Sequence, residues 1–131
     1  MKFQADKSSA PMVLQHDVGS VTLGLIKDGQ PEKVTLSSSF ILSSRGFWQP
    51  WSVSAWAELG DESFEPIAKI SPQICIFGSG ERLQFAPPAL LKNLLAARIG
   101  LETMGNAAAC RTYNVLAAEG RDVSLAVLLG A

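Results

Sequence analysis

The chain has few of the side chains from which most active sites are built. Its 131 residues include one histidine, two cysteines and one tyrosine, and only 18% of them are charged. Cys75 and Cys110 are too few for a disulfide scaffold or a structural zinc site. No carboxylates are paired at a spacing typical of acid–base catalysis. We therefore expect neither a bound metal ion nor a cofactor.

The sequence also lacks a basic cluster and a long apolar run. Eleven basic and twelve acidic residues nearly cancel, and the basic ones are scattered. This argues against nucleic-acid binding, because a phosphate backbone is contacted by clustered positive charge. No apolar segment approaches the ~20 residues of a membrane-spanning helix. The N-terminal stretch MKFQADKSSAPMVLQHD has the pattern of neither a signal peptide nor a presequence, so we expect a cytoplasmic protein.

The length and apolar content predict one domain preceded by a short arm. Because 47% of the residues are apolar, the chain can bury a single core. Residues 1–16 are polar and show no periodicity, which predicts a flexible arm over 1–16 and a domain over 17–131. His16 is then expected to be a solvated residue of the arm.

The N-terminal part of the domain has the alternation of a β-hairpin or meander. Strands are predicted over residues 20–27 and 33–42, separated by the turn-forming dipeptide Asp28-Gly29. A further strand is predicted over 45–53, followed by short helical pieces over 54–69.

The C-terminal half alternates short apolar runs with helical patterns. The predicted elements are a strand over 73–77, a helix over 87–98, a strand over 99–104, a helix over 107–119 and a strand over 123–129. Asn106 is expected to cap the second helix and Gly120 to end it. The buried stripe of the first helix is predicted to be Leu90, Leu91, Leu94 and Leu95. This order predicts an α/β fold with parallel neighbouring strands.

The segment Gly78-Ser79-Gly80 follows a predicted strand but does not complete a dinucleotide-binding motif. That motif requires a third glycine at position 83, where the chain has Leu83. Two interpretations remain open for the segment. It is either a tight turn at the strand end or a set of backbone N–H groups that bind a small anion.

Cys110, in the predicted helix over 107–119, also has two interpretations. The neighbouring Arg111 and the helix N-terminus favour a lowered thiol pKa, but His16 is the only histidine that could serve as base. A helical wheel places Cys110 and Tyr113 on the packed face. Arg111 and Asn114, three positions apart, can face one site together. They are predicted to hold the Gly78–Gly80 segment or to bind a carboxylate or phosphate.

Three tryptophans, Trp48, Trp51 and Trp56, crowd the middle of the chain. They are expected to pack in the core and hairpin, and the alternative is a surface for a protein partner, where tryptophan is enriched.

Several of these motifs together resemble a small family of domains without an assigned function. The family includes the mitochondrial complex I (NADH dehydrogenase) assembly factor 3, the adipogenesis-associated domain protein and free-standing bacterial and archaeal proteins. The matching pieces are Gly78 and Gly80, the run Gln84-Phe85-x-Pro-Pro, the strand IGLETM and, as the most specific, ACRTYNVLAAEGR. Trp51 matches a tryptophan common in the family's third strand.

The resemblance implies a three-layer α/β fold, with a central mixed sheet, helices on one side and the N-terminal hairpin or meander in a further layer. It carries over no catalytic residues. We therefore expect a non-enzymatic binding or assembly-factor-like module, either monomeric or homodimeric. The candidate ligand- or partner-binding residues are Gly78, Ser79, Gly80, Arg111 and Asn114, followed by Cys110, Tyr113 and Trp51. The alternatives are a small-anion or small-molecule binder at the Gly78–Gly80 segment and an enzyme or redox protein that uses Cys110.

Overall fold

A meander of three antiparallel strands begins the part of the chain that the structure describes. This computed structural model describes residues 10–130. The strands of the small sheet, in spatial order, are β1 (Met12–Asp17), β2 (Ser20–Lys27) and β3 (Gln30–Leu36). Between β2 and β3, Asp28 and Gly29 both adopt positive φ angles, of 54° and 79°. These are the angles of a two-residue hairpin turn, so the predicted turn is confirmed.

The other strands form a mixed sheet of five. In spatial order they are β5 (Phe47–Pro50), β4 (Phe40–Ser43), β8 (Val123–Val127), β6 (Ile74–Gly78) and β7 (Gly100–Met104). β6 pairs in parallel with β7 and with β8, whereas β4 pairs antiparallel with β5 and with β8. The parallel neighbours predicted from the strand–helix alternation are therefore confirmed.

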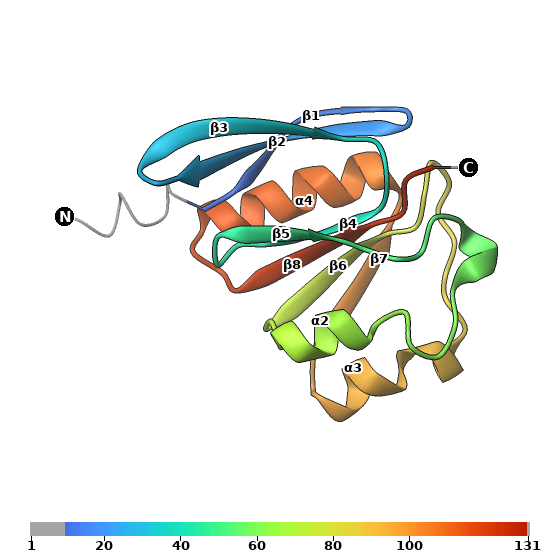
Figure 1. Cartoon of the computed structure of the whole chain (residues 1–131). Helices are drawn as coiled ribbons and strands as arrows, with labels where there is room; N and C mark the ends of the chain where they lie inside the picture. The colour runs from blue at the N-terminus through green and yellow to red at the C-terminus, as the bar shows by residue number, and fades with distance from the viewer. Residues whose placement is uncertain (1–9, 131) are drawn as a thin grey trace.

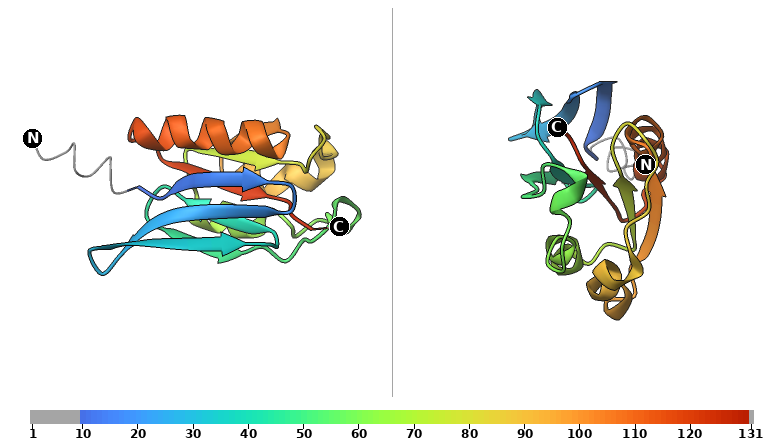
Figure 2. Two further views of the ribbon diagram at one scale, coloured as in Figure 1. Left: turned by 90° about the horizontal axis from the view of Figure 1, so that it is seen from above. Right: turned by 90° about the vertical axis from the view of Figure 1, so that its right-hand side faces the viewer.

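Helices cover both faces of the five-stranded sheet (Figures 1 and 2). α4 (Asn106–Ala118) lies with the small sheet on one face, and α2 (Glu65–Ile70) and α3 (Lys92–Ala96) lie on the other. Two turns of 3₁₀-helix, η1 (Trp56–Glu58) and η2 (Pro88–Leu91), complete the elements of the described residues. The layered α/β class is confirmed, but the helices occupy two sides instead of the one that the resemblance implied.

The reason for two helical layers is visible in the strands, since successive residues of a strand point to opposite faces. In β4, Phe40 and Leu42 belong to the cluster shared with α4 and the small sheet, and Ile41 belongs to the cluster shared with α2 and α3. All three side chains are fully buried. Because both faces are apolar, both require a cover.

The prediction of a flexible arm over residues 1–16 is wrong for its last part. Residues 12–17 are β1, which pairs with β2 along its whole length except for an irregularity between Val13 and Gln15. Such a bulge shifts the side-chain alternation, so the sequence of β1 does not show the regular period of a strand. Residues 1–9 lie outside the described residues.

Two other predicted elements are divided in the structure. The strand over 33–42 is two strands, because the chain leaves the small sheet after Leu36 and enters the large one at Phe40. The helix over 87–98 is η2 followed by α3, and of the four leucines predicted to be buried only Leu94 is; Leu95 is 70% exposed. The tighter 3₁₀ turn changes the residue period, so a continuous α-helical stripe cannot form.

Candidate functional site

The Gly78–Gly80 segment forms the turn at the end of β6, and the side chain of Asn106 fills it. Asn106 is 2% exposed; its Oδ1 accepts the Gly80 N–H at 3.0 Å and its Nδ2 donates to the Leu128 carbonyl at 2.8 Å. A Cβ added to Gly78 would lie 2.5 Å from that Oδ1, so glycine at this position leaves room for the amide. The prediction that Asn106 caps α4 is wrong: Gly105 precedes the helix and the Asn106 side chain makes no cap hydrogen bond.

The buried hydroxyl of Ser79 stabilises the turn by hydrogen bonds to its backbone. Its hydroxyl donates to the Arg82 carbonyl at 2.9 Å and accepts the Gln84 N–H at 3.0 Å. Beside the turn, at the carboxyl ends of β6 and β8, lies a hollow of about 290 Å³ lined by Ser79 and Gly80 but not by Arg111 or Asn114. The structure thus does not gather the predicted site residues into one pocket.

Asn114 and Tyr113 hold the small sheet instead of the Gly78–Gly80 turn. The Asn114 Oδ1 accepts the Val13 N–H at 2.8 Å, and its Nδ2 donates to the Val13 carbonyl, also at 2.8 Å. The Tyr113 hydroxyl donates to the Pro11 carbonyl at 2.8 Å from a fully buried ring. One amide side chain therefore pairs with β1 as a neighbouring strand would. These bonds attach Pro11 and the start of β1 to α4.

Arg111 lines a second hollow, of about 350 Å³, between α4 and β1. Within residues 10–130 its guanidinium takes part in neither of the two ion pairs. His16 lines the same hollow and is not the solvated residue that we expected, since its side chain is only 16% exposed. Its Nε2 lies 3.7 Å from the Glu81 Oε2 and has no hydrogen-bond partner. The hollow therefore combines an accessible cation with a covered imidazole.

The thiol of Cys110 is not activated. Burial raises its pKa to about 11; Arg111 lowers it by less, and the Glu81 carboxylate raises it further. The predicted effect of Arg111 is present, but desolvation outweighs it because Cys110 is 3% exposed. Burial likewise raises the pKa of Cys75 to about 12. Both cysteines are free thiols, protonated at neutral pH.

Trp51, one of the three weaker candidate site residues, is a core residue. It is 4% exposed, and its ring meets Phe64 and Phe77 in edge-to-face geometry. Its Nε1 donates to the Ser63 carbonyl at 2.7 Å. The packing interpretation therefore holds for this tryptophan, and the indole N–H has the buried partner that it requires.

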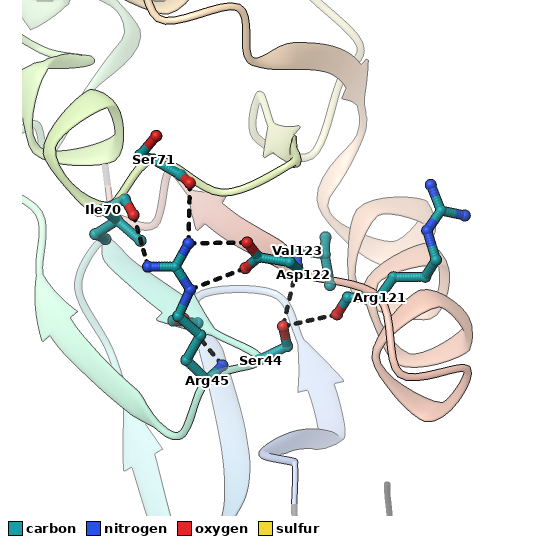
Figure 3. A network of polar contacts seen from close by, with 8 residues as sticks. Ser44, Arg45, Ile70, Ser71, Arg121, Asp122 and Val123 are labelled. Atoms are coloured by element: carbon teal, nitrogen blue, oxygen red, sulfur yellow. Dashed lines mark hydrogen bonds and ion pairs between the residues drawn. The ribbon is translucent and has the colours of Figure 1, made fainter.

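A polar network that the sequence analysis did not identify joins three turns at the opposite end of the sheet (Figure 3). Arg45, in the β4–β5 turn, forms a bidentate pair with Asp122, with bonds of 3.0 and 2.8 Å. The same guanidinium donates to the carbonyls of Ile70 and Ser71 at the end of α2, at 2.7 and 2.9 Å. Four hydrogen bonds from one side chain thus join the end of α2 to the β4–β5 turn and to Asp122, which directly precedes β8. Because 77 residues separate Arg45 from Asp122, no local pattern could have shown the pair.

These features define a class of protein: a layered α/β domain in which one helix clamps a small sheet and anchors the turn of the parallel strands. The chain belongs to the family described as "Protein of unknown function (DUF498/DUF598)", whose model matches residues 26–128. The family recognised from the ACRTYNV helix is thereby confirmed.

Three similar proteins illustrate how the family's members are described. A Xenopus tropicalis protein named NADH dehydrogenase [ubiquinone] 1 alpha subcomplex assembly factor 3 is 29% identical over 80 residues; the match covers 60% of this chain and 44% of the relative. The chain thus spans less than half the length of that relative. A Francisella tularensis protein named 13 kDa major membrane protein is 24% identical over 98% of this chain and 99% of its own. An NMR structure from Xanthomonas campestris is 35% identical, with a TM-score of 0.73 over 92% of this chain and 85% of its own.

The described residues also bear on two of the functional expectations. No helix within residues 10–130 has the length and apolar character needed to cross a bilayer. In the same part of the chain, no three His, Cys, Asp or Glu side chains are grouped so that they could hold a metal ion.

Proposed function

We propose that the protein is a non-enzymatic module that binds another protein and supports its assembly in the cytoplasm. The observation that carries the proposal is how the polar side chains of α4 are used. Asn106, Tyr113 and Asn114 all serve as hydrogen-bonded anchors between layers, and Cys110 is a buried, protonated thiol. These side chains of α4 therefore stabilise the packing of the layers.

The surface supports a protein partner. Four large apolar side chains on the half of the chain after β6 are at least half exposed: Leu83 at 54%, Phe85 at 70%, Leu95 at 70% and Val115 at 57%. Burying such side chains against a partner removes apolar surface from water, which favours association. The assembly-factor name of the relatives agrees with this proposal.

Chemical crosslinking of the full chain in its native cells tests the proposal. A tagged protein should be recovered in a complex with a defined partner at fixed stoichiometry. Cys110→Ala should be recovered in the same complex, because the thiol has no role in binding. Recovery of the free protein alone, together with a catalytic turnover that Cys110→Ala abolishes, would establish the enzymatic alternative instead.

A second candidate function is the binding of a small anion, favoured by the hollow between α4 and β1. There the guanidinium of Arg111 is accessible, whereas at the Gly78–Gly80 turn the Gly80 N–H is already bound to Asn106. Phosphate and acetate should raise the melting temperature of the wild type but not that of Arg111→Gln, with chloride at equal ionic strength as the control. Equal shifts in both proteins would remove this candidate.

A further inference from the structure

The two sheets have four edge strands: β1 and β3 in the small sheet, and β5 and β7 in the large one. An edge strand has unpaired N–H and C=O groups on its free side. Native proteins protect such edges with proline, charged residues, short strands or a covering group. The four edges of this protein differ in how far they are protected.

Three of the edges are protected. The free side of β1 is occupied at Val13, where the Asn114 amide binds both the N–H and the C=O. β3 carries Pro31, followed by Glu32 and Lys33, and proline and charge both oppose pairing. β5 is only four residues long and ends in Pro50.

β7 is less protected than the other three edges. It contains no proline and a single charge, and within residues 10–130 it pairs only with β6. The Gly100 N–H donates to Gln73 on the β6 side, and the Met104 carbonyl accepts from Ser79 on the same side. Because consecutive residues of a strand direct their polar groups to opposite sides, Leu101 and Thr103 direct theirs to the free side. In the right-hand view of Figure 2, β7 is the orange strand at the margin of the sheet.

The side chains around this edge give the occupant a chemical character. Glu102, in the middle of β7, is exposed and aligns with Ile76, which faces α4. On α4, Thr112 donates to the Met104 sulfur at 3.3 Å, and Val115, three residues further on, is 57% exposed. Residues three apart on a helix share a face, so Val115 extends along the β7 side. On the α4 side, the edge therefore has the carboxylate of Glu102 and the exposed apolar side chain of Val115.

A second copy of the chain fits this edge poorly when the two β7 strands pair about their centres. Two β7 strands paired antiparallel about a two-fold axis through their centres would place Glu102 opposite Glu102. Like charges that face each other across a strand pair are destabilising, whereas opposite charges stabilise the pair. The charge of β7 therefore favours a segment with a basic residue opposite Glu102.

We propose that the β7 edge binds an extended segment of a partner protein, which adds to the sheet as a sixth strand with a Lys or Arg opposite Glu102 and an apolar residue over Val115. Backbone hydrogen bonds to Leu101 and Thr103 hold the segment, and the side chains select it, as in other cases of strand addition. This inference rests on the proposed protein-binding function and assigns its surface.

The experiment uses the ¹⁵N-labelled full chain and two capped peptides of alternating Val and Thr, one with a central Lys and one with a central Glu. Amide exchange is measured with and without peptide, and affinity is measured by titration. Two variants separate binding from folding. Thr103→Pro removes an outward N–H and leaves the β6 pairing intact, and Thr103→Val keeps that N–H. Thermal unfolding confirms that both variants are folded.

The Lys peptide should slow exchange at Leu101 and Thr103 by at least about tenfold. It should bind about fivefold more tightly than the Glu peptide, and Glu102→Lys should reverse this order. Thr103→Pro should lose binding and Thr103→Val should keep it.

Unchanged exchange at both amides, or equal binding by Thr103→Pro, would overturn the proposal. So would a dimer of the free protein in which these amides are already protected. A native partner that is crosslinked equally to the wild type and to Thr103→Pro would refute the β7 edge but leave the proposed function standing.

Discussion

Asn114→Ala tests the finding that one amide fastens the small sheet to α4. The substitution removes two hydrogen bonds of 2.8 Å to Val13. Val13 is 8% exposed, so its N–H and C=O lose their partner in a place that water reaches poorly. An unpaired group of this kind costs about 1–1.5 kcal/mol, and the free energy of unfolding should therefore fall by about 2–3 kcal/mol. The melting temperature should fall by about 6–12 °C.

Urea denaturation followed by tryptophan fluorescence measures this loss, and amide exchange locates it. Exchange should accelerate most in β1, because the other anchor on that side of the strand is the Tyr113 hydroxyl bond to Pro11. Arg111→Ala is the matched control on the same helix, and its exposed side chain predicts a change within about 0.5 kcal/mol. Asn114→Asp should destabilise as well, since it keeps an acceptor for the N–H but turns a second oxygen toward the Val13 carbonyl.

A loss below about 0.5 kcal/mol for Asn114→Ala, equal to that of the control, would refute the reasoning. It would mean that water satisfies Val13 as well as the amide does. A large loss with unchanged exchange in β1 would show that Asn114 acts elsewhere.

Three further predictions follow from close contacts and burial. Gly78→Ala should lower the free energy of unfolding by at least about 2 kcal/mol, because its Cβ would meet an amide oxygen at 2.5 Å, whereas Gly100→Ala, with its nearest atom at 3.8 Å, should be near neutral. Ser124→Ala should be neutral or stabilising by up to about 1 kcal/mol in urea denaturation, since the buried hydroxyl has no partner; Ser39→Ala should destabilise by about 1–3 kcal/mol, because its hydroxyl has two. Burial raises the pKa of Cys110 from 9.0 to about 11, so this thiol stabilises the folded state below pH 9, and the contribution should disappear as the pH rises from 9 to 11.

Each of these three has an outcome that would contradict it. Equal losses for the two glycine variants would mean that the Asn106 amide moves aside without cost. A clear loss on Ser124→Ala would reveal a hydrogen bond of that hydroxyl. For the thiol, the fall in stability above pH 9 should be shallower in Cys110→Ala, and an identical pH profile in the variant would assign the fall to other groups.

In the candidate site, the burial of side chains could be predicted from the sequence, whereas their hydrogen-bond partners could not. The face of α4 that carries Cys110 and Tyr113 followed from helical periodicity, and both residues are buried. The partners of Asn114 did not follow, because they belong to β1, whose alternation is broken by a bulge. The role of Asn106 was also misassigned, since its identity and position fit a helix cap equally well.

The sequence by itself determined the elements whose signals are local. The Asp28-Gly29 turn, the apolar run of β6 and the 3.6-residue period of α4 each require only neighbouring residues, and each lies where it was expected. Tertiary structure alone decided the contacts that join distant segments. Asn114 meets Val13 across 101 residues, and Arg45 meets Asp122 across 77. A polar side chain has many chemically suitable partners in the chain, and only the packing of the layers brings one of them within hydrogen-bond distance.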